Sequence, residues 1–282
     1  MNVETPFRDF LAFWERAAGR PREEQVALWD ELYARPNLRT IAQYERHFAG
    51  VATLEDALPR YGEVVELLEP RFAAIELERG GDEVAALLDV DVPFRAVALV
   101  GLFTANAWFD DDYAGEPAVF FALEADPPDL WHRTIAIHEL VHLAHHLARS
   151  GGWEETVPAQ SVFMEGLAVA ATRRLVPEAT GEQHFAVDDY EAWTAECRAA
   201  WDDAARKLLD CFERPDADER RRFFWPDWGR DARDVPERFG YYAAAEAFAA
   251  AAEGHDLAEL ARWPPERAAA EVRSALEALT PR

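Results

Sequence analysis

The sequence predicts a mostly α-helical protein of the α+β class, with a small β-sheet whose edge strand lies beside a histidine-rich helix. Half of the 282 residues are hydrophobic and 12% are aromatic, which is enough to bury a sizeable core. Apolar residues recur at helical spacing through most of the chain. One region, near residues 94–124, is instead β-branched and apolar in the manner of strands. We therefore expect helices before and after one small sheet.

Residues 1–90 are expected to form a helical N-terminal region. The stretches FLAFWERA, EEQVALWDELYA and LRTIAQYERHFAG have helical spacing, with Pro21 and Pro36 between them. The pattern continues to Gly80 and Gly81, a pair typical of a helix end. From chain order, we expect this region to cap the cleft of a second domain, residues 91–282, unless the two form one continuous domain.

The middle of the chain predicts two strands followed by a long helix. FRAVALVGLFT (94–104) and AVFFALE (118–124) are strand-like, and NAWFDDDYAGEP (106–117) is typical of a loop, with DDDY (110–113) as a solvated acidic turn. Asp126 can cap a helix that runs from about Asp129 to Arg149. Further helices are expected near 158–176, 188–212, 240–253 and 265–279, with a long ordered loop over 213–240.

The stretch HELVH, residues 138–142, matches the H-E-x-x-H pattern of zinc-dependent hydrolases. His138 and His142 are four residues apart, so on a helix they share one face about 6 Å apart, within reach of one tetrahedral zinc ion. Glu139 lies about 100° around the helix from His138, where it can take a proton from a water at the metal without ligating the metal. The pattern predicts a metal site with its own general base.

A third ligand is expected at Glu165, within the otherwise apolar stretch SVFMEGLAVAA. Burying a carboxylate in such a helix is costly unless the carboxylate is paired or binds a metal. The loop GGWEETVP gives the chain room to reverse, so this helix can pack beside the HELVH helix. The alternative is a glutamate on the exposed side of an amphipathic helix. Two histidines and one glutamate predict Zn²⁺ as the cofactor, with a fourth position left for water.

Two further histidines, His145 and His146, follow on the same helix. His146 lies one turn beyond His142 and borders the same face, so it is a candidate contact to substrate. His142 with His146 forms a rival ligand pair of the same spacing, but no glutamate follows the first histidine of that pair. We assign no role to His145.

HELVH on one helix, with the candidate ligand Glu165 on the next, resembles the gluzincin metallopeptidases. The combination of HELVH, MEGLA and FGYYAAAEAF looks more like an uncharacterised bacterial family of predicted zinc-dependent proteases with HExxH, EGLA and GY motifs. The gluzincin resemblance covers roughly residues 95–176 and implies a zincin-like fold. Val169 departs from the thermolysin pattern, in which an acidic residue follows the ligand glutamate by one turn.

The resemblance also implies roles for residues outside the two helices. In such enzymes the strand before the HExxH helix is an edge strand that holds the peptide substrate as an added strand, and AVFFALE has this position. Asn106 and Trp108 would line substrate subsites, the alternative being a loop asparagine and a packed tryptophan. Tyr241 or Tyr242 would stabilise the oxyanion, with Tyr241 preferred because it follows Gly240 as in the GY motif. The alternative is two packed tyrosines.

The sequence therefore predicts a zinc-dependent metallopeptidase that acts on a peptide or protein substrate. An alternative is a zinc-binding protein of zincin fold that acts on a non-peptide amide or serves as a non-catalytic regulatory or binding module. A third is an acidic helical interaction protein with an accidental HExxH. The net charge of −25 argues against nucleic acid and anionic membranes as partners. No membrane-spanning window or signal peptide is recognisable, so a cytoplasmic location is expected, and the oligomeric state is left open.

Overall fold

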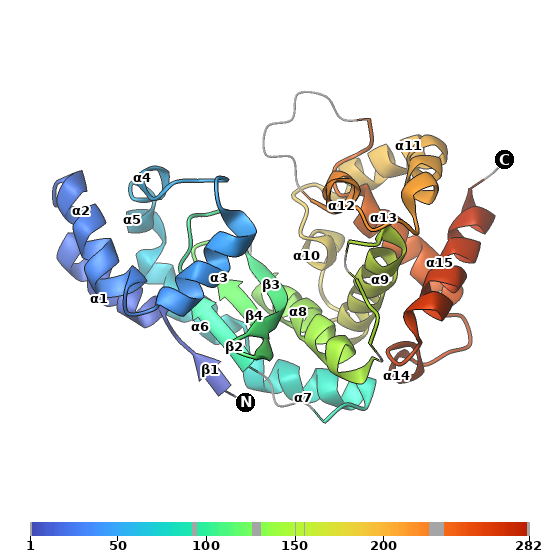
Figure 1. Cartoon of the computed structure of the whole chain (residues 1–282), viewed down its shortest axis with the longest axis horizontal. Coiled ribbons are helices and arrows are strands. Elements are labelled where there is room, and N and C mark those ends of the chain that lie inside the picture. Colours follow the sequence, from blue (N-terminus) through green and yellow to red (C-terminus); the bar gives the residue numbers. More distant parts are fainter. Residues whose placement is uncertain are drawn as a thin grey trace. The chain divides into compact units, whose positions relative to one another are not determined.

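The structure is a computed structural model that describes residues 2–91, 95–125, 131–149, 151–154, 156–225 and 234–280. These residues form a mostly helical α+β fold with one four-stranded sheet, which confirms the predicted fold class (Figure 1). The chain divides into two compact units, one of Met1–Asp82 with Val92–Leu143 and one of Glu83–Asp91 with Ala144–Arg282. The domain boundary expected at residue 90 stays a prediction.

The helices before the sheet are short and successive, as the apolar spacing predicts. They are α1 (Phe7–Ala17), α2 (Arg22–Trp29), the π-helix η1 (Asp30–Ala34), α3 (Leu38–Phe48), α4 (Leu54–Ala57), α5 (Tyr61–Val64), the 3-10 helix η2 (Val65–Leu67), α6 (Leu68–Ala74) and α7 (Leu77–Leu88). The HELVH stretch lies on α8 (Trp131–Ala148), one continuous helix. The capping residues proposed for this helix, Asp126 to Asp129, lie outside the described residues.

The helices after α8 are α9 (Pro158–Leu175), α10 (Gly181–Phe185), α11 (Tyr190–Cys211), α12 (Ala217–Phe224), α13 (Phe239–Ala251), α14 (Leu257–Leu260) and α15 (Pro265–Leu279). Four of them, α9, α11, α13 and α15, lie where the sequence predicts helices. The expected loop over 213–240 is wrong in part, because α12 lies within it. Helices α9, α13 and α15 pack against one another and form the core of the second unit (Figure 1).

The sheet contains β1 (Asn2–Glu4), β2 (Arg95–Leu99), β3 (Ala107–Tyr113) and β4 (Glu116–Ala122), in the order β1-β2-β4-β3. Strand β2 runs parallel to β1 and β4, and β3 runs antiparallel to β4. The stretch AVFFALE therefore belongs to an interior strand, so the expectation that it forms the edge strand is wrong. In the described sheet β3 is the edge strand next to β4.

Strand β3 corrects the prediction of a loop over 106–117. Trp108, Asp110 and Tyr113 are buried, and the hairpin turns at Ala114 and Gly115 with φ of 61° and 86°. Aspartates disfavour strands, and three in succession hide this pattern in the sequence. Asp110 is not a solvated turn residue, since its Oδ2 lies 2.7 Å from His47 Nε2 of α3. His47, which carried no predicted role, supplies that partner.

Gly80 lies inside α7, so the helix end predicted at Gly80 and Gly81 is wrong. A Cβ atom on Gly80 would lie 3.2 Å from side-chain carbons of both Ile137 and Leu140 on α8. Glycine here allows α7 to approach the HELVH helix closely, which offsets its usual helix-interior cost of about 1 kcal/mol.

Buried tyrosines of the N-terminal helices bind the backbone that follows β2. The Tyr33 hydroxyl donates to the carbonyl oxygen of Val100 at 2.6 Å and accepts from its N–H at 2.9 Å. The Tyr61 hydroxyl donates to the carbonyl oxygen of Gly101 at 2.8 Å. Both tyrosines are fully buried. Because buried backbone groups need partners, these two tyrosines tie η1 and α5 to the segment after β2. The expected capping role of residues 1–90 stays a prediction.

Helix α3 covers one face of the sheet through Tyr44. Its ring packs with Trp108 of β3, which stacks on Phe120 of β4 at a centroid distance of 4.8 Å. Its hydroxyl accepts a hydrogen bond from Leu102 N–H at 2.8 Å. Tyr44 thus joins the apolar core of the sheet to the same backbone segment that Tyr33 and Tyr61 bind.

We expect a chain lacking residues 1–90 to lose its β-sheet unit, because the truncation removes β1 and all three tyrosine partners of the segment after β2. Near-ultraviolet circular dichroism and thermal melting of the truncated and full chains would measure this. A soluble fragment 91–282 with a cooperative melt would contradict the expectation and favour a separable cap.

We also expect Gly166→Ala to destabilise the second unit by about 1–3 kcal/mol, the usual cost of overpacking. A Cβ atom on this residue of α9 would lie 2.8 Å from the carbonyl oxygen of Ala244 on α13, leaving it no room. Chemical denaturation would measure the change in the free energy of unfolding. Gly151→Ala is the matched control, since a Cβ atom there meets nothing within 4 Å. Equal stability of both variants would contradict the inference.

Candidate metal centre

Helix α8 presents the two candidate histidine ligands from an otherwise apolar helix. Ile137, Leu140 and Val141 are fully buried and fix the rotation of the helix in the core. His138 and His142 alternate with these residues and are partly exposed. The buried residues therefore determine which way the two imidazoles point.

The two imidazoles face each other as metal ligands do. His138 Nε2 and His142 Nε2 are 3.1 Å apart, and the ring centroids are 4.7 Å apart. Two zinc–nitrogen bonds of about 2.0–2.1 Å at a tetrahedral angle separate their nitrogens by roughly 3.4 Å. The observed spacing needs an adjustment of only a few tenths of an ångström, so the pair fits a single metal ion.

Glu165 of α9 completes a group of three donors. His138, His142 and Glu165 each offer one ligand atom, and these atoms all lie within 4.8 Å of one another. Glu165 is 4% exposed, so it does not lie on the exposed side of an amphipathic helix. Two imidazoles and one carboxylate are the donors of many catalytic zinc sites, which keep the fourth position open. The donor set and its spacing fit zinc.

Glu139 follows His138 on α8 and is partly exposed. On a helix, neighbouring side chains diverge by about 100°, so Glu139 lies beside the histidine face rather than on it. A carboxylate in this position is available to accept a proton. Its predicted role as general base remains a prediction.

The other two histidines of α8 have partners of their own. His146 Nδ1 accepts a hydrogen bond of 3.0 Å from Arg149 Nη2. His145 is 1% exposed and its ring lies 4.6 Å from that of Trp153, as expected of a packed histidine. The substrate contact predicted for His146 stays a prediction, and the group of three donors contains His138 rather than His146.

The two candidate tyrosines lie on different sides of α13. Phe248 of α13 packs against Phe163 of α9. Tyr241 lies seven residues before Phe248 on α13, which is only about 20° from Phe248 around the helix axis. Tyr242 lies about 120° from Phe248 and is 7% exposed, and its hydroxyl accepts a hydrogen bond of 3.3 Å from Arg198 Nε. Burial raises the pKa of Tyr242. The ring of Tyr241 lies 5.7 Å from that of Phe224 on α12 and 4.5 Å from the guanidinium of Arg238. The oxyanion role of either tyrosine stays a prediction.

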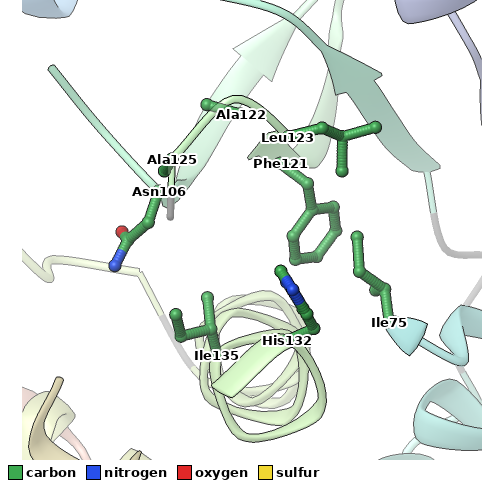
Figure 2. A pocket seen from close by; sticks show the side chains of 8 residues that line it. All are labelled: Ile75, Asn106, Phe121, Ala122, Leu123, Ala125, His132 and Ile135. Atoms are coloured by element: carbon green, nitrogen blue, oxygen red, sulfur yellow. The ribbon is translucent and has the colours of Figure 1, made fainter. Parts of the chain in front are cut away.

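The two residues predicted to line subsites have different surroundings. Asn106 borders a small pocket, shown in Figure 2, whose other residues come from β4, the turn after it, α8 and the end of α6. The pocket has an interior volume of about 20 Å³, room for roughly one water molecule. Trp108 is 8% exposed and packs in the core between Phe120 and Tyr44. The subsite roles of both residues stay predictions.

Besides Asp110, a second buried acid is not predicted from the sequence. Glu124 follows β4 and is fully buried, and its Oε1 accepts a hydrogen bond of 3.1 Å from Phe103 N–H. The sequence does contain a signal for this buried acid, because a glutamate ends the apolar run AVFFALE just as Glu165 interrupts an apolar helix. The cost of burying a carboxylate drew attention to Glu165 and applies equally here.

Comparisons of the chain with models of protein families, with curated proteins and with solved structures find no match. The resemblance to gluzincin metallopeptidases therefore stays a prediction. Among the described residues, no helix is long and apolar enough to cross a lipid bilayer.

We expect the purified chain to bind one equivalent of Zn²⁺, and His142→Ala to weaken binding more than about 100-fold. Even residues that only orient metal ligands contribute 10–100-fold to affinity, so loss of a ligand should cost more. Titration calorimetry against a competing chelator would measure both constants. His47→Ala is the control, since His47 is bonded to Asp110 and lies outside the donor group. Unchanged affinity in His142→Ala would remove this histidine from the site.

Proposed function

We propose that the chain is a zinc-dependent hydrolase that cleaves peptide bonds, with His138, His142 and Glu165 as metal ligands and Glu139 as general base. The observation that carries the proposal is the group of three donor atoms within 4.8 Å of one another, contributed by two helices. A carboxylate beside two facing imidazoles is a donor set that a divalent zinc ion can share. The adjacent Glu139 is what distinguishes a catalytic from a structural site.

Zinc bound by these ligands supplies a Lewis acid that polarises a carbonyl and makes water a nucleophile near neutral pH. The carboxylate of Glu139 accepts a proton from the attacking water and returns it to the leaving nitrogen. Tyr241, near the start of α13, is the candidate donor to the developing oxyanion.

The edge of the sheet supports a peptide as the substrate. Strand β3 has a partner on one side within the described sheet, so its other side offers backbone N–H and C=O groups to an extended peptide. Asn106 immediately precedes this strand and borders the pocket in Figure 2. In this proposal β3, rather than AVFFALE, binds the substrate backbone.

We also place the chain in the cytoplasm as part of this proposal. Cys197 and Cys211 are buried free thiols, which suits a reducing compartment. Burial raises the pKa of Cys197 to about 12 and that of Cys211 to about 11, so neither thiol is ionised near neutral pH.

We expect Glu139→Gln to abolish peptide hydrolysis while the variant still binds one equivalent of zinc. The amide keeps the shape of the side chain but cannot take the proton from water. Turnover of a peptide library by the zinc-loaded protein, followed by mass spectrometry, would measure activity, and metal analysis of the same sample would measure zinc. Glu78→Gln, an exposed position on α7, is the control. Full activity of Glu139→Gln would disprove the mechanism.

The same digest separates the proposal from its nearest alternative. Stoichiometric zinc without any cleavage of the library by the unchanged chain would favour a non-peptide amide as substrate, or a non-catalytic binding role. Absence of stoichiometric zinc would instead favour an interaction protein in which HExxH is accidental.

A further inference from the structure

Glu124 carries an oxygen that the fold leaves without a partner. The side chain is fully buried in the turn after β4, and its Oε2 has no hydrogen-bond partner among the residues that the structure describes. Its Oε1 accepts from Phe103 N–H, and Gly101 is packed so tightly that a Cβ atom there would lie 2.9 Å from this oxygen. The carboxyl therefore clamps the Gly101–Thr104 segment to the turn after β4.

Within the described part of the chain, Glu124 is surrounded mainly by phenol groups, with one cation near it. Tyr33 of η1, Tyr44 of α3 and Tyr61 of α5 surround it, and each has its pKa raised in part by the Glu124 charge. Arg71 of α6 is the cation, but its Nη1 donates to the carbonyl oxygens of Leu123 and Glu124 at 2.9 and 3.3 Å. The ionised carboxyl is thus held among phenol rings and backbone N–H groups.

The clamped segment is strained. Phe103 adopts φ of 60°, in the left-handed region that an aromatic residue rarely occupies, at a typical cost of about 1–3 kcal/mol. Its ring is held between Tyr61 and the guanidinium of Arg60, which lies 3.7 Å from the ring centroid. Tyr33, Tyr61 and Tyr44 bind Val100, Gly101 and Leu102, whereas Glu124 binds the N–H of the strained residue itself. Loss of the Glu124 contact therefore allows the backbone at Phe103 to relax.

We propose that Glu124 is a proton-dependent latch: its protonated carboxyl holds the Gly101–Thr104 segment against the turn after β4, and loss of the proton releases the segment. The ionised form gains water only if the two segments separate, whereas the neutral form loses little by staying buried. Release of the segment also relieves the strain in the backbone of Phe103. This proposal concerns the N-terminal unit and does not depend on zinc or on hydrolysis.

The latch acts on the pocket of Figure 2. Asn106 follows the clamped segment, and Leu123 and Ala125 flank Glu124 in the turn, so these three pocket residues stand on the two parts that the carboxyl joins. Ile135 and His132 line the pocket from α8. Separation of the two parts would widen the pocket on the side away from the helix, which makes its size depend on pH.

The direction of the pH effect follows from burial, which raises the pKa of Glu124 from 4.5 to about 7. The opened segment exposes the carboxyl and restores the lower pKa, so opening releases a proton between about pH 4.5 and 7. The closed form is therefore most stable below about pH 4.5 and loses stability as the pH rises through about 7. Above about pH 7 the carboxyl is ionised in both the closed and the opened form, so the stability of the closed form no longer changes with pH.

Amide hydrogen exchange of the intact chain tests the latch. Protection of residues 101–104, corrected for the intrinsic exchange rate, should fall about tenfold for each pH unit between pH 5 and 7 and level off above pH 7. Glu124→Gln, which mimics the neutral form, should keep its protection constant over this range. Glu116→Gln, an exposed glutamate of β4, should behave like the unchanged chain.

Two results would overturn the latch: protection in the unchanged chain that does not depend on pH, or the same slope in Glu124→Gln. If Glu124→Gln does not fold, carbon-13 NMR of the unchanged chain decides, since the Glu124 carboxyl carbon reports its own titration. A midpoint near neutral pH supports the latch, and a midpoint below pH 5 overturns it.

Discussion

The need to pair the buried backbone after β2 is the constraint on which the first unit depends. This segment leaves the sheet where no neighbouring strand continues, so its N–H and C=O groups must find side chains. Tyr33, Tyr61 and Tyr44 satisfy groups of Val100, Gly101 and Leu102, and Glu124 satisfies the N–H of Phe103. Helices remote in sequence are thereby fixed to the sheet, so the first unit depends on the N-terminal helices as well as on its strands.

The parts of the structure that could be predicted from the sequence are those with a local cause. Apolar spacing places α9, α11, α13 and α15, because a helix long enough to bury a stripe shows that stripe in its own residues. The spacing of His138 and His142 is equally local. Glu165 can be predicted from an energetic argument, because burying an unpaired carboxylate in an apolar helix costs free energy.

The parts that could not be predicted have causes elsewhere in the fold. Three aspartates conceal β3, and the imidazole of His47 with the guanidinium of Arg46, both from α3, explain how Asp110 can be buried. Gly80 suggests a helix end until Ile137 and Leu140 of α8 are seen to occupy the space above it. Strand β1 is three residues long and forms only because β2 lies beside it. In each case the decisive atom is distant in sequence, so no local pattern could contain it.

The aspartates of β3 also affect whether the edge of this sheet pairs with further copies of the chain. An unprotected edge strand is a template on which further chains can add, and continued addition leads to aggregates. Asp111 and Asp112 are exposed on that strand, and the chain carries a net charge of −25, so a second copy approaching in register would bring like charges together. A neutral or basic extended segment meets no such repulsion. The exposed aspartates thus disfavour pairing of β3 with β3 of a second copy, but they do not disfavour its pairing with a neutral or basic strand.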